Sequence, residues 1–169
     1  KGLYLNRNKK NVERVLDQNY VEHHPIVENG YLYDENYHPG RSAYFLAGLY
    51  YIQEPSAMLV ADALPIEPDD FVLDMCAAPG GKSCEIASRL TGEGVLIAND
   101  IEASRARILS ENIERFGLDN TIVTNIDPMR FTKQFQEAFD KIVLDAPCSG
   151  EGMFRKLEQA IDTWSEEKV

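Results

Sequence analysis

A loop of small residues is the segment of this sequence best suited to hold a ligand. Residues 76–83 read CAAPGGKS and follow a short apolar run. Because alanine and glycine carry little or no side chain, the loop backbone can lie close to a bound group. Further along, Asp145 and Cys148 add a carboxylate and a thiol, which can hold a proton and attack electron-poor carbon. The sequence therefore predicts a ligand site with reactive groups beside it.

Two nucleotide-binding loops share part of this pattern. Gly81, Lys82 and Ser83 match the end of a P-loop, so a nucleotide hydrolase that uses Lys82 and Ser83 is one alternative. However, Cys76 replaces the first glycine of that motif, and Pro79 has no N–H to offer a phosphate. The dinucleotide pattern G-x-G-x-x-G is absent. The turn instead suits a compact zwitterion, such as the methionine end of S-adenosylmethionine.

Acidic residues follow the predicted strands. Four short apolar runs read as strands: residues 71–75, 95–98, 121–126 and 141–144. An acidic residue ends or follows each run: Asp74, Asp100, Asp127 and Asp145. At the end of the second strand, the Asp100 carboxylate can accept hydrogen bonds from both hydroxyls of a ribose. For the other acids, a role as a cap or turn former stays open.

Predicted helices alternate with these strands and must position the loop. They cover residues 56–64, 83–90, 103–116 and 131–139, with Ser56 as an expected N-cap. Such alternation predicts an α/β fold with a parallel sheet that binds ligands at the carboxyl ends of its strands. Residues 1–52 are rich in tyrosine and form a small irregular or β-containing region. We therefore divide the chain into residues 1–52 and 53–169.

Composition excludes several classes of protein. The 169 residues are 44% hydrophobic and carry a net charge of −11, which by itself does not favour RNA. Basic residues in the first fifteen positions allow a local basic patch, although a solvated charged face explains them equally well. Three cysteines and three scattered histidines predict neither a disulfide framework nor a metal site, and we expect a cytoplasmic protein. No apolar run is long enough to cross a membrane.

Two motifs together resemble a known family. The sequences DMCAAPGGK at residues 74–82 and DAPCSG at 145–150 closely resemble the Nop/Sun family of RNA 5-methylcytosine methyltransferases, and YIQEPSAM at 51–58 is also similar. The resemblance covers about residues 28–169 and is strongest to the bacterial RsmF type, which modifies small-subunit ribosomal RNA. It implies a Rossmann-like class I methyltransferase fold, here the N-terminal half of its parallel sheet, preceded by a small α+β region. It also implies S-adenosyl-L-methionine as cofactor and ribosomal RNA or the small ribosomal subunit as partner.

The resemblance assigns roles to single residues. The residues expected to bind the cofactor are Cys76, Ala77, Ala78, Pro79, Gly80, Gly81, Lys82, Asp100, Arg105, Asp127 and Asp145. The expected catalytic residues are Cys148, Asp145 and Lys82. Cytosine carbon 5 attacks a methyl group only after a thiolate has added to carbon 6. An acid near ring nitrogen 3 stabilises that adduct, and Asp145 would need burial to keep the proton this requires.

The sequence also departs from the family pattern. DNA cytosine-5 enzymes use the cysteine of a Pro-Cys motif as nucleophile, whereas the RNA family uses a second cysteine, in a Thr-Cys motif, and Cys148 would assist product release. No Thr-Cys motif follows Cys148, so we expect the 169-residue chain to form no methylated product. Half a sheet would also leave an apolar strand edge uncovered, which predicts a chain–chain contact there. The alternative is a non-catalytic RNA-binding or assembly module with a relic cofactor fold.

Overall fold

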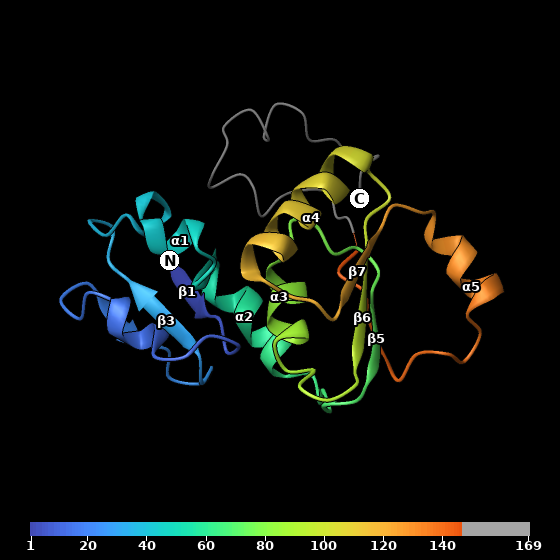
Figure 1. The fold of residues 1–169 in the computed structure, drawn as a ribbon, viewed down its shortest axis with the longest axis horizontal. Coiled ribbons are helices and arrows are strands. Elements are labelled where there is room, and N and C mark those ends of the chain that lie inside the picture. The colour runs from blue at the N-terminus through green and yellow to red at the C-terminus, as the bar shows by residue number, and fades with distance from the viewer. Residues whose placement is uncertain (147–169) are drawn as a thin grey trace, which may run out of the picture.

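The computed structural model describes residues 1–146 and contains two four-stranded sheets with helices between them (Figure 1). The N-terminal sheet is antiparallel, with strand order β2-β3-β1-β4. Its strands are β1 (Gly2–Leu5), β2 (Val21–His23), β3 (Gly30–Tyr33) and β4 (Tyr50–Gln53). Three short helices connect them: η1 (Val12–Val15), η2 (Pro39–Arg41) and α1 (Ala43–Leu46). This confirms the expected small region with β structure.

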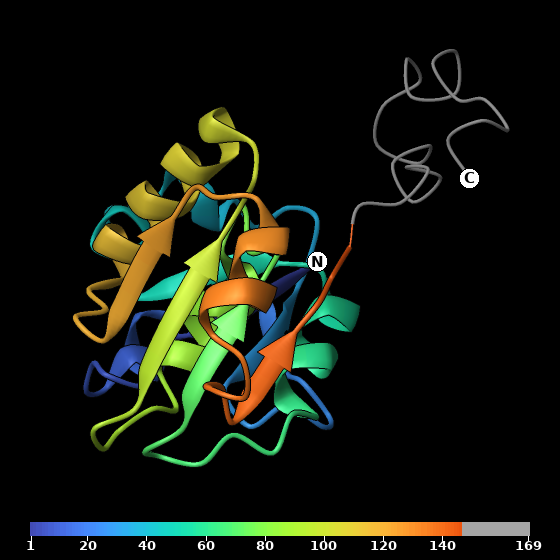
Figure 2. The same ribbon diagram turned by 90° about the vertical axis from the view of Figure 1, so that its right-hand side faces the viewer.

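The second sheet is parallel and has the strand order β7-β6-β5-β8. Its strands are β5 (Phe71–Asp74), β6 (Val95–Asn99), β7 (Thr121–Thr124) and β8 (Lys141–Val143). Its helices are α2 (Pro55–Asp62), α3 (Gly81–Ala87), α4 (Ala103–Phe116), η3 (Pro128–Arg130) and α5 (Phe131–Gln134). Figures 1 and 2 show α3 and α4 on one face and α5 on the other. The predicted α/β fold is confirmed.

Helix α4 forms for the reason that its sequence indicates. Ala106, Leu109, Ile113 and Phe116 recur at helical spacing, and all four are buried. Gly117 ends the helix with φ 75°, where glycine carries no steric penalty, and its N–H donates to the carbonyls of Ile113 and Glu114. The predicted bounds, residues 103–116, are those of the structure.

The other helices differ from the prediction, and α3, expected over residues 83–90, spans Gly81–Ala87. Helix α2 begins at Pro55 and has Glu54, not Ser56, as its N-cap, because the fixed φ of proline suits the first helical position. The helix expected over residues 131–139 ends at Gln134. Beyond it the chain turns so that Phe135 and Phe139 pack against each other and Phe131, which explains the shorter helix.

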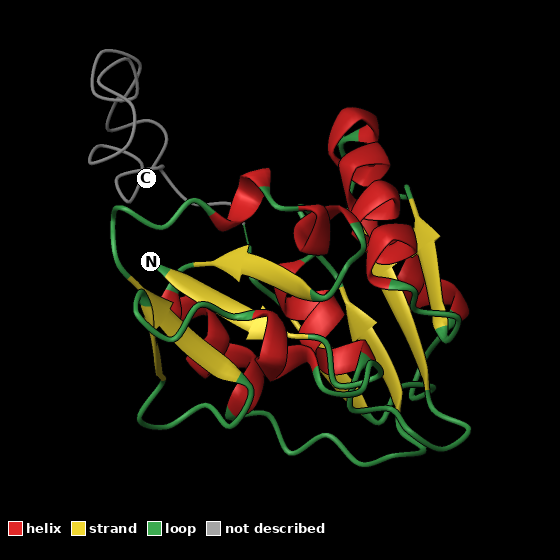
Figure 3. Cartoon of the chain, turned by 60° about the vertical axis from the view of Figure 1, so that its left-hand side comes forward, coloured by secondary structure: helices red, strands yellow, loops and turns green. Residues whose placement is uncertain are grey.

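The N-terminal sheet shares its core with the parallel sheet. Tyr4 and Tyr51 belong to the same buried cluster as Leu109 and Phe116 of α4. Asn6 is also buried, and its Nδ2 donates to the carbonyl oxygens of Gly48 and Phe116. Figure 3 shows both sheets from one side. The contacts mean that residues of the first sheet help to position elements of the second.

Across residues 1–146, none of the helices has the length and apolar character that crossing a membrane requires.

Candidate functional site

The carboxyl ends of the parallel strands bring two of the predicted acids to one edge of the sheet. Asp74 ends β5 and pairs in register with Ala98 of β6. Asp100 follows β6, and its N–H donates to the carbonyl of Thr124 at 3.2 Å. The loop that leaves β5 is held beside them, because the Ala77 N–H donates to the carbonyl of Asn99 at 2.8 Å. The sequence predicted this grouping from the alternation of strands and helices.

Asp100 has an unsatisfied acceptor in a buried position. Its side chain is 2% exposed. Oδ1 accepts from the N–H of Glu102 at 3.0 Å, while Oδ2 has no hydrogen-bond partner. The nearest cation is Nη2 of Arg105, 3.3 Å from Oδ2. Since a buried acceptor without a partner costs free energy, this oxygen is suited to receive a hydroxyl of a ligand.

Asp74 lies deeper beneath the loop. Its Oδ2 accepts from the hydroxyl of Ser83 at 2.7 Å, and Oδ1 has no hydrogen-bond partner. Burial raises the pKa of the Asp74 carboxyl to about 6, and the Ser83 hydroxyl and the charge of Lys82 lower it in part. The carboxyl can therefore hold a proton under mildly acidic conditions.

The small-residue loop has one backbone position that requires glycine. Gly80 has φ 111°, and a side chain there would meet Leu109. The preceding Ala78–Pro79 peptide is cis. The two carbonyls face α4: Arg105 Nη2 donates to Ala78 O and Asn112 Nδ2 donates to Pro79 O, each at 2.8 Å. Side chains of α4 thus fix the conformation of the loop.

Lys82 and Asp145 meet across the site. Lys82 Nζ lies 2.7 Å from Asp145 Oδ2, so the cation at the start of α3 pairs with the carboxylate that follows β8. This pairing occupies the lysine that a P-loop would direct at a phosphate. The burial that we expected around Asp145 is not present, because its side chain is 61% exposed. Solvent and Lys82 surround that carboxyl instead.

The remaining predicted residues lie at varied positions. Asp127 is exposed, and its side chain accepts from the Met129 N–H at 2.9 Å, so it caps η3. Cys76 is partly exposed; burial, and next to it the charges of Asp100 and Asp74, raise the pKa of its thiol. Cys148 lies outside the described residues. Within residues 1–146, no group of three acidic, histidine or cysteine side chains could hold a metal ion.

Sequence reasoning missed two residues beside Asp100. Asn125 Nδ2 donates to the carbonyls of Asp100 and Ile101, at 2.7 and 2.9 Å, and so ties the turn after β6 to the segment after β7. Ile101 is 61% exposed, which leaves an apolar face next to the buried carboxylate. The sequence offered one signal, which concerns Ile101: an apolar residue directly follows Asp100, the acid after the second strand.

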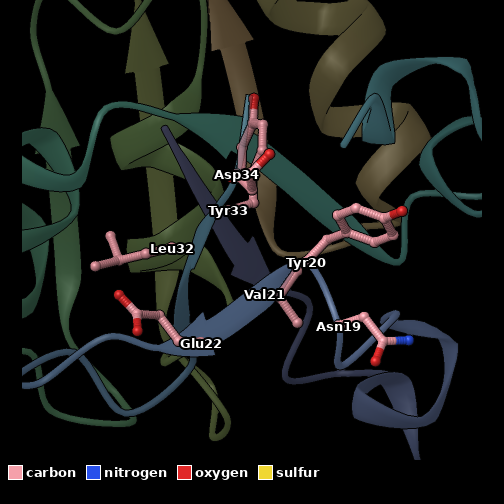
Figure 4. Close-up of a pocket in the computed structure, with 7 residues that line it drawn as sticks. All are labelled: Asn19, Tyr20, Val21, Glu22, Leu32, Tyr33 and Asp34. Atoms are coloured by element: carbon pink, nitrogen blue, oxygen red, sulfur yellow. The ribbon is translucent and has the colours of Figure 1, made fainter. Parts of the chain in front are cut away.

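A surface cavity of about 350 Å³ lies elsewhere, at the edge of the N-terminal sheet (Figure 4). Residues of β2, of β3 and of the segments next to them line it, among them Glu22, Tyr33 and Tyr20. None of the predicted site residues contributes to its lining. The strand-end site is therefore defined by its buried carboxylates and loop, and not by this cavity.

A parallel sheet, a tight loop after its first strand and a buried carboxylate after its second are typical of a Rossmann-like domain. The chain belongs to the 16S rRNA methyltransferase RsmB/F family, whose model matches residues 61–168. A model described as the N-terminal domain of 16S rRNA methyltransferase RsmF matches residues 1–55.

Curated relatives are similar over most of this chain. A ribosomal RNA small subunit methyltransferase F from Pectobacterium atrosepticum is 46% identical over 138 residues, which are 80% of this chain and 28% of that protein. The protein of the same name from Vibrio cholerae serotype O1 is 45% identical over 150 residues, 86% of this chain and 32% of that protein. The chain thus spans about a third or less of the length of these relatives.

Solved structures are similar as well. A methyltransferase homolog protein from Pyrococcus horikoshii superposes with a TM-score of 0.79 at 32% identity, covering 95% of this chain and 54% of that one. NSun6 from Pyrococcus horikoshii, solved with SFG, gives a TM-score of 0.61 at 37% identity, covering 66% of this chain and 29% of that one.

Proposed function

We propose that this chain is the cofactor-binding part of an enzyme that methylates carbon 5 of cytosine in ribosomal RNA of the small subunit. The family to which the chain belongs supports the reaction and the substrate class. The observation that carries the cofactor assignment is Asp100, a buried carboxylate beside the small-residue loop whose Oδ2 lies near Arg105 but accepts no hydrogen bond. S-adenosyl-L-methionine has a ribose to satisfy that oxygen and a zwitterionic end to lie against the loop.

The residues present fit this cofactor. Ribose hydroxyls donate hydrogen bonds, and Asp100 Oδ2 is an acceptor that accepts no hydrogen bond within the protein. Ile101 is exposed next to it and offers apolar contact to a planar base. The roles of the whole set stay proposals: the loop residues Cys76–Gly81 with Lys82 for the methionine end, Asp100 and Arg105 for the ribose, and Asp127 for the adenine end.

When bound, S-adenosyl-L-methionine supplies an electrophilic methyl group. The chain's own residues bind and orient the reactants. Lys82 and Asp145 form an ion pair that we place between the cofactor and the target base, where the exposed Asp145 carboxylate can contact the ring. Cys148 is proposed to assist product release after thiolate addition to carbon 6. These assignments rest on the motifs and on the ion pair of Lys82 with Asp145.

We also propose that two segments of the chain have different roles. Residues 1–52 are assigned to an RNA-associated region and residues 53–169 to the methyltransferase core. Among the described residues β8 is an edge strand, and Ile142 and the following Leu144 are exposed, so a chain–chain contact there would remove apolar surface from water. An enzyme that acts on ribosomal RNA would work in the cytoplasm.

Calorimetry with S-adenosylhomocysteine, the demethylated cofactor, tests the proposal. We expect the chain to bind it and Asp100→Asn to weaken binding by roughly tenfold or more, because hydrogen bonds to a charged acceptor contribute about 1.5–3 kcal/mol. Asp119→Asn is the matched control, since Asp119 is exposed on the surface. Equal affinity in Asp100→Asn and the unaltered chain, or no binding by the unaltered chain, would refute the assignment.

A further inference from the structure

The carbonyl of Pro79 accepts hydrogen bonds from two different parts of the chain. Asn112 Nδ2 of α4 donates to it at 2.8 Å, and the hydroxyl of Tyr51 of β4 donates at 3.3 Å. Burial raises the pKa of Tyr51, so its hydroxyl keeps the proton that it donates. In a trans peptide the C=O and the following N–H point in opposite directions, so holding this carbonyl also fixes the direction of the Gly80 N–H.

Arg115 determines which way the Asn112 amide points. Its Nη2 donates to Asn112 Oδ1 at 2.9 Å, which leaves Nδ2 to face Pro79. Without that bond the amide could turn its oxygen toward the Pro79 carbonyl, and two acceptors would then face each other. The two residues are three apart on α4 and therefore lie on the same side of the helix.

Arg115 is itself held by the N-terminal region. Its Nη1 donates to the carbonyl of Phe45 at 2.9 Å, and its guanidinium lies 4.1 Å from the centroid of the Phe45 ring and 5.7 Å from that of Tyr51. Contacts of a guanidinium with aromatic faces are attractive. Arg115 thus connects α1 and β4 to the amide that holds the loop.

The N-terminal sheet also lies directly against the next loop residue. A side chain at Gly81 would overlap Oε1 of Gln53 and lie 3.2 Å from a ring carbon of Tyr51. A side chain at position 81 would therefore have to displace the end of the Gln53 side chain, whatever ligand the loop binds. The loop is enclosed between α4 and the N-terminal sheet.

We propose that Tyr51, Asn112 and Arg115, here termed the Pro79 cluster, are positioning residues through which the N-terminal region sets the affinity of the loop for the amino-acid end of the cofactor. This inference rests on the proposed function, which assigns that end of S-adenosyl-L-methionine to the loop. The cluster acts through the Pro79 carbonyl and the backbone that follows it. The part of the ligand held by Asp100 does not depend on this cluster.

Two ligands separate a local effect on the loop from a general loss of structure. S-adenosylhomocysteine has the amino-acid end, and 5′-methylthioadenosine shares its adenosine and thioether but lacks that end. In calorimetry with the full chain, we expect Asn112→Ala and Arg115→Met to weaken S-adenosylhomocysteine binding roughly fivefold, the equivalent of one typical hydrogen bond. Tyr51→Phe should have a smaller effect, since its bond is long. The affinity for 5′-methylthioadenosine should stay, in each of the three variants, within about twofold of that of the unaltered chain.

Asn112→Asp provides a sharper variant. A carboxylate at this position keeps the contact with Arg115 and makes it a charge pair, but it presents an acceptor to the Pro79 carbonyl. We therefore expect an unchanged or higher melting temperature together with weaker S-adenosylhomocysteine binding than in Asn112→Ala. Arg107→Met is the matched control on α4, because the Arg107 side chain is 83% exposed.

The outcomes separate the cluster from the cofactor assignment. Selective loss of S-adenosylhomocysteine binding supports the inference. Equal losses for both ligands would show a general structural role and overturn it, as would unchanged affinity for S-adenosylhomocysteine in Asn112→Asp. If the unaltered chain binds neither ligand, the proposed function fails and the inference fails with it.

Discussion

Glu85 is predicted to make the stability of this protein fall as pH rises. Its side chain on α3 is fully buried, Oε2 accepts from Gln53 Nε2 at 3.3 Å, and Oε1 has no partner. Burial raises the pKa of the carboxyl from 4.5 to about 8; the Gln53 hydrogen bond and the charges of Arg89 and Arg7 lower it in part, and Asp62 raises it further. Between these two values the folded chain keeps a proton that the unfolded chain has released. The free energy of unfolding must therefore decrease with rising pH in this window.

The size of the change in the free energy of unfolding follows from the pH range between the two pKa values of Glu85. Each pH unit in which the two states differ by one proton changes the free energy of unfolding by about 1.4 kcal/mol. The pKa of Asp74 is also raised, but only to about 6, so its contribution above pH 6.5 is small, about 0.2 kcal/mol. Between pH 6.5 and 8, Glu85 should thus lower the free energy of unfolding by about 1–2 kcal/mol.

Urea unfolding at a series of pH values measures this slope. Glu85→Gln keeps the size of the side chain and removes the titration, so the variant should lose the decrease between pH 6.5 and 8. Glu93→Gln, at an exposed position, should keep the slope of the unaltered chain. Parallel curves for Glu85→Gln and the unaltered chain would show that the Glu85 carboxyl is already ionised in the folded protein, and would refute the reasoning.

Two further predictions concern the junction between the sheets. Asn6→Ala leaves the buried carbonyls of Gly48 and Phe116 without their donor and should lower the free energy of unfolding by roughly 2–3 kcal/mol in urea titrations; a loss below about 0.5 kcal/mol would mean that water replaces the amide. Gly81→Ala should cost roughly 1–3 kcal/mol because of overlap with Gln53, and the added substitution Gln53→Ala should recover part of it. Strict additivity of the two substitutions would contradict that explanation.

The bounds of an element could be predicted from the sequence where its buried residues recur at regular spacing and a recognisable residue ends it. Helix α4 has four buried apolar residues at helical spacing and a glycine after its last residue, so its bounds could be predicted. The parallel sheet followed from the alternation of strands and helices. Helix α5 could not be predicted at its full extent, because Phe135 and Phe139 satisfy the helical pattern but pack with Phe131 outside a helix.

The candidate site was predictable to the extent that topology determines it. Acids that follow parallel strands meet at one edge, and Asp74 and Asp100 do so. Burial could not be read from the same pattern: Asp100 is buried, whereas Asp145 is mostly exposed and Asp127 caps a turn. Whether a carboxylate at a strand end is covered depends on the loops around it, and those are determined by contacts between distant residues.

The contacts that support the loop explain why two separate sequence motifs occur together. Tyr51 and Gln53 belong to the segment YIQEPSAM, and Pro79 and Gly81 belong to CAAPGGK, 28 residues further along. In the structure Tyr51 donates to the Pro79 carbonyl, and Gln53 occupies the space that a side chain at Gly81 would need. Each motif therefore limits which residues the other can contain. Sequence reasoning attributes this glycine pattern wholly to a ligand, but at Gly81 the packing of Gln53 and Tyr51 against the loop also favours a residue without a side chain.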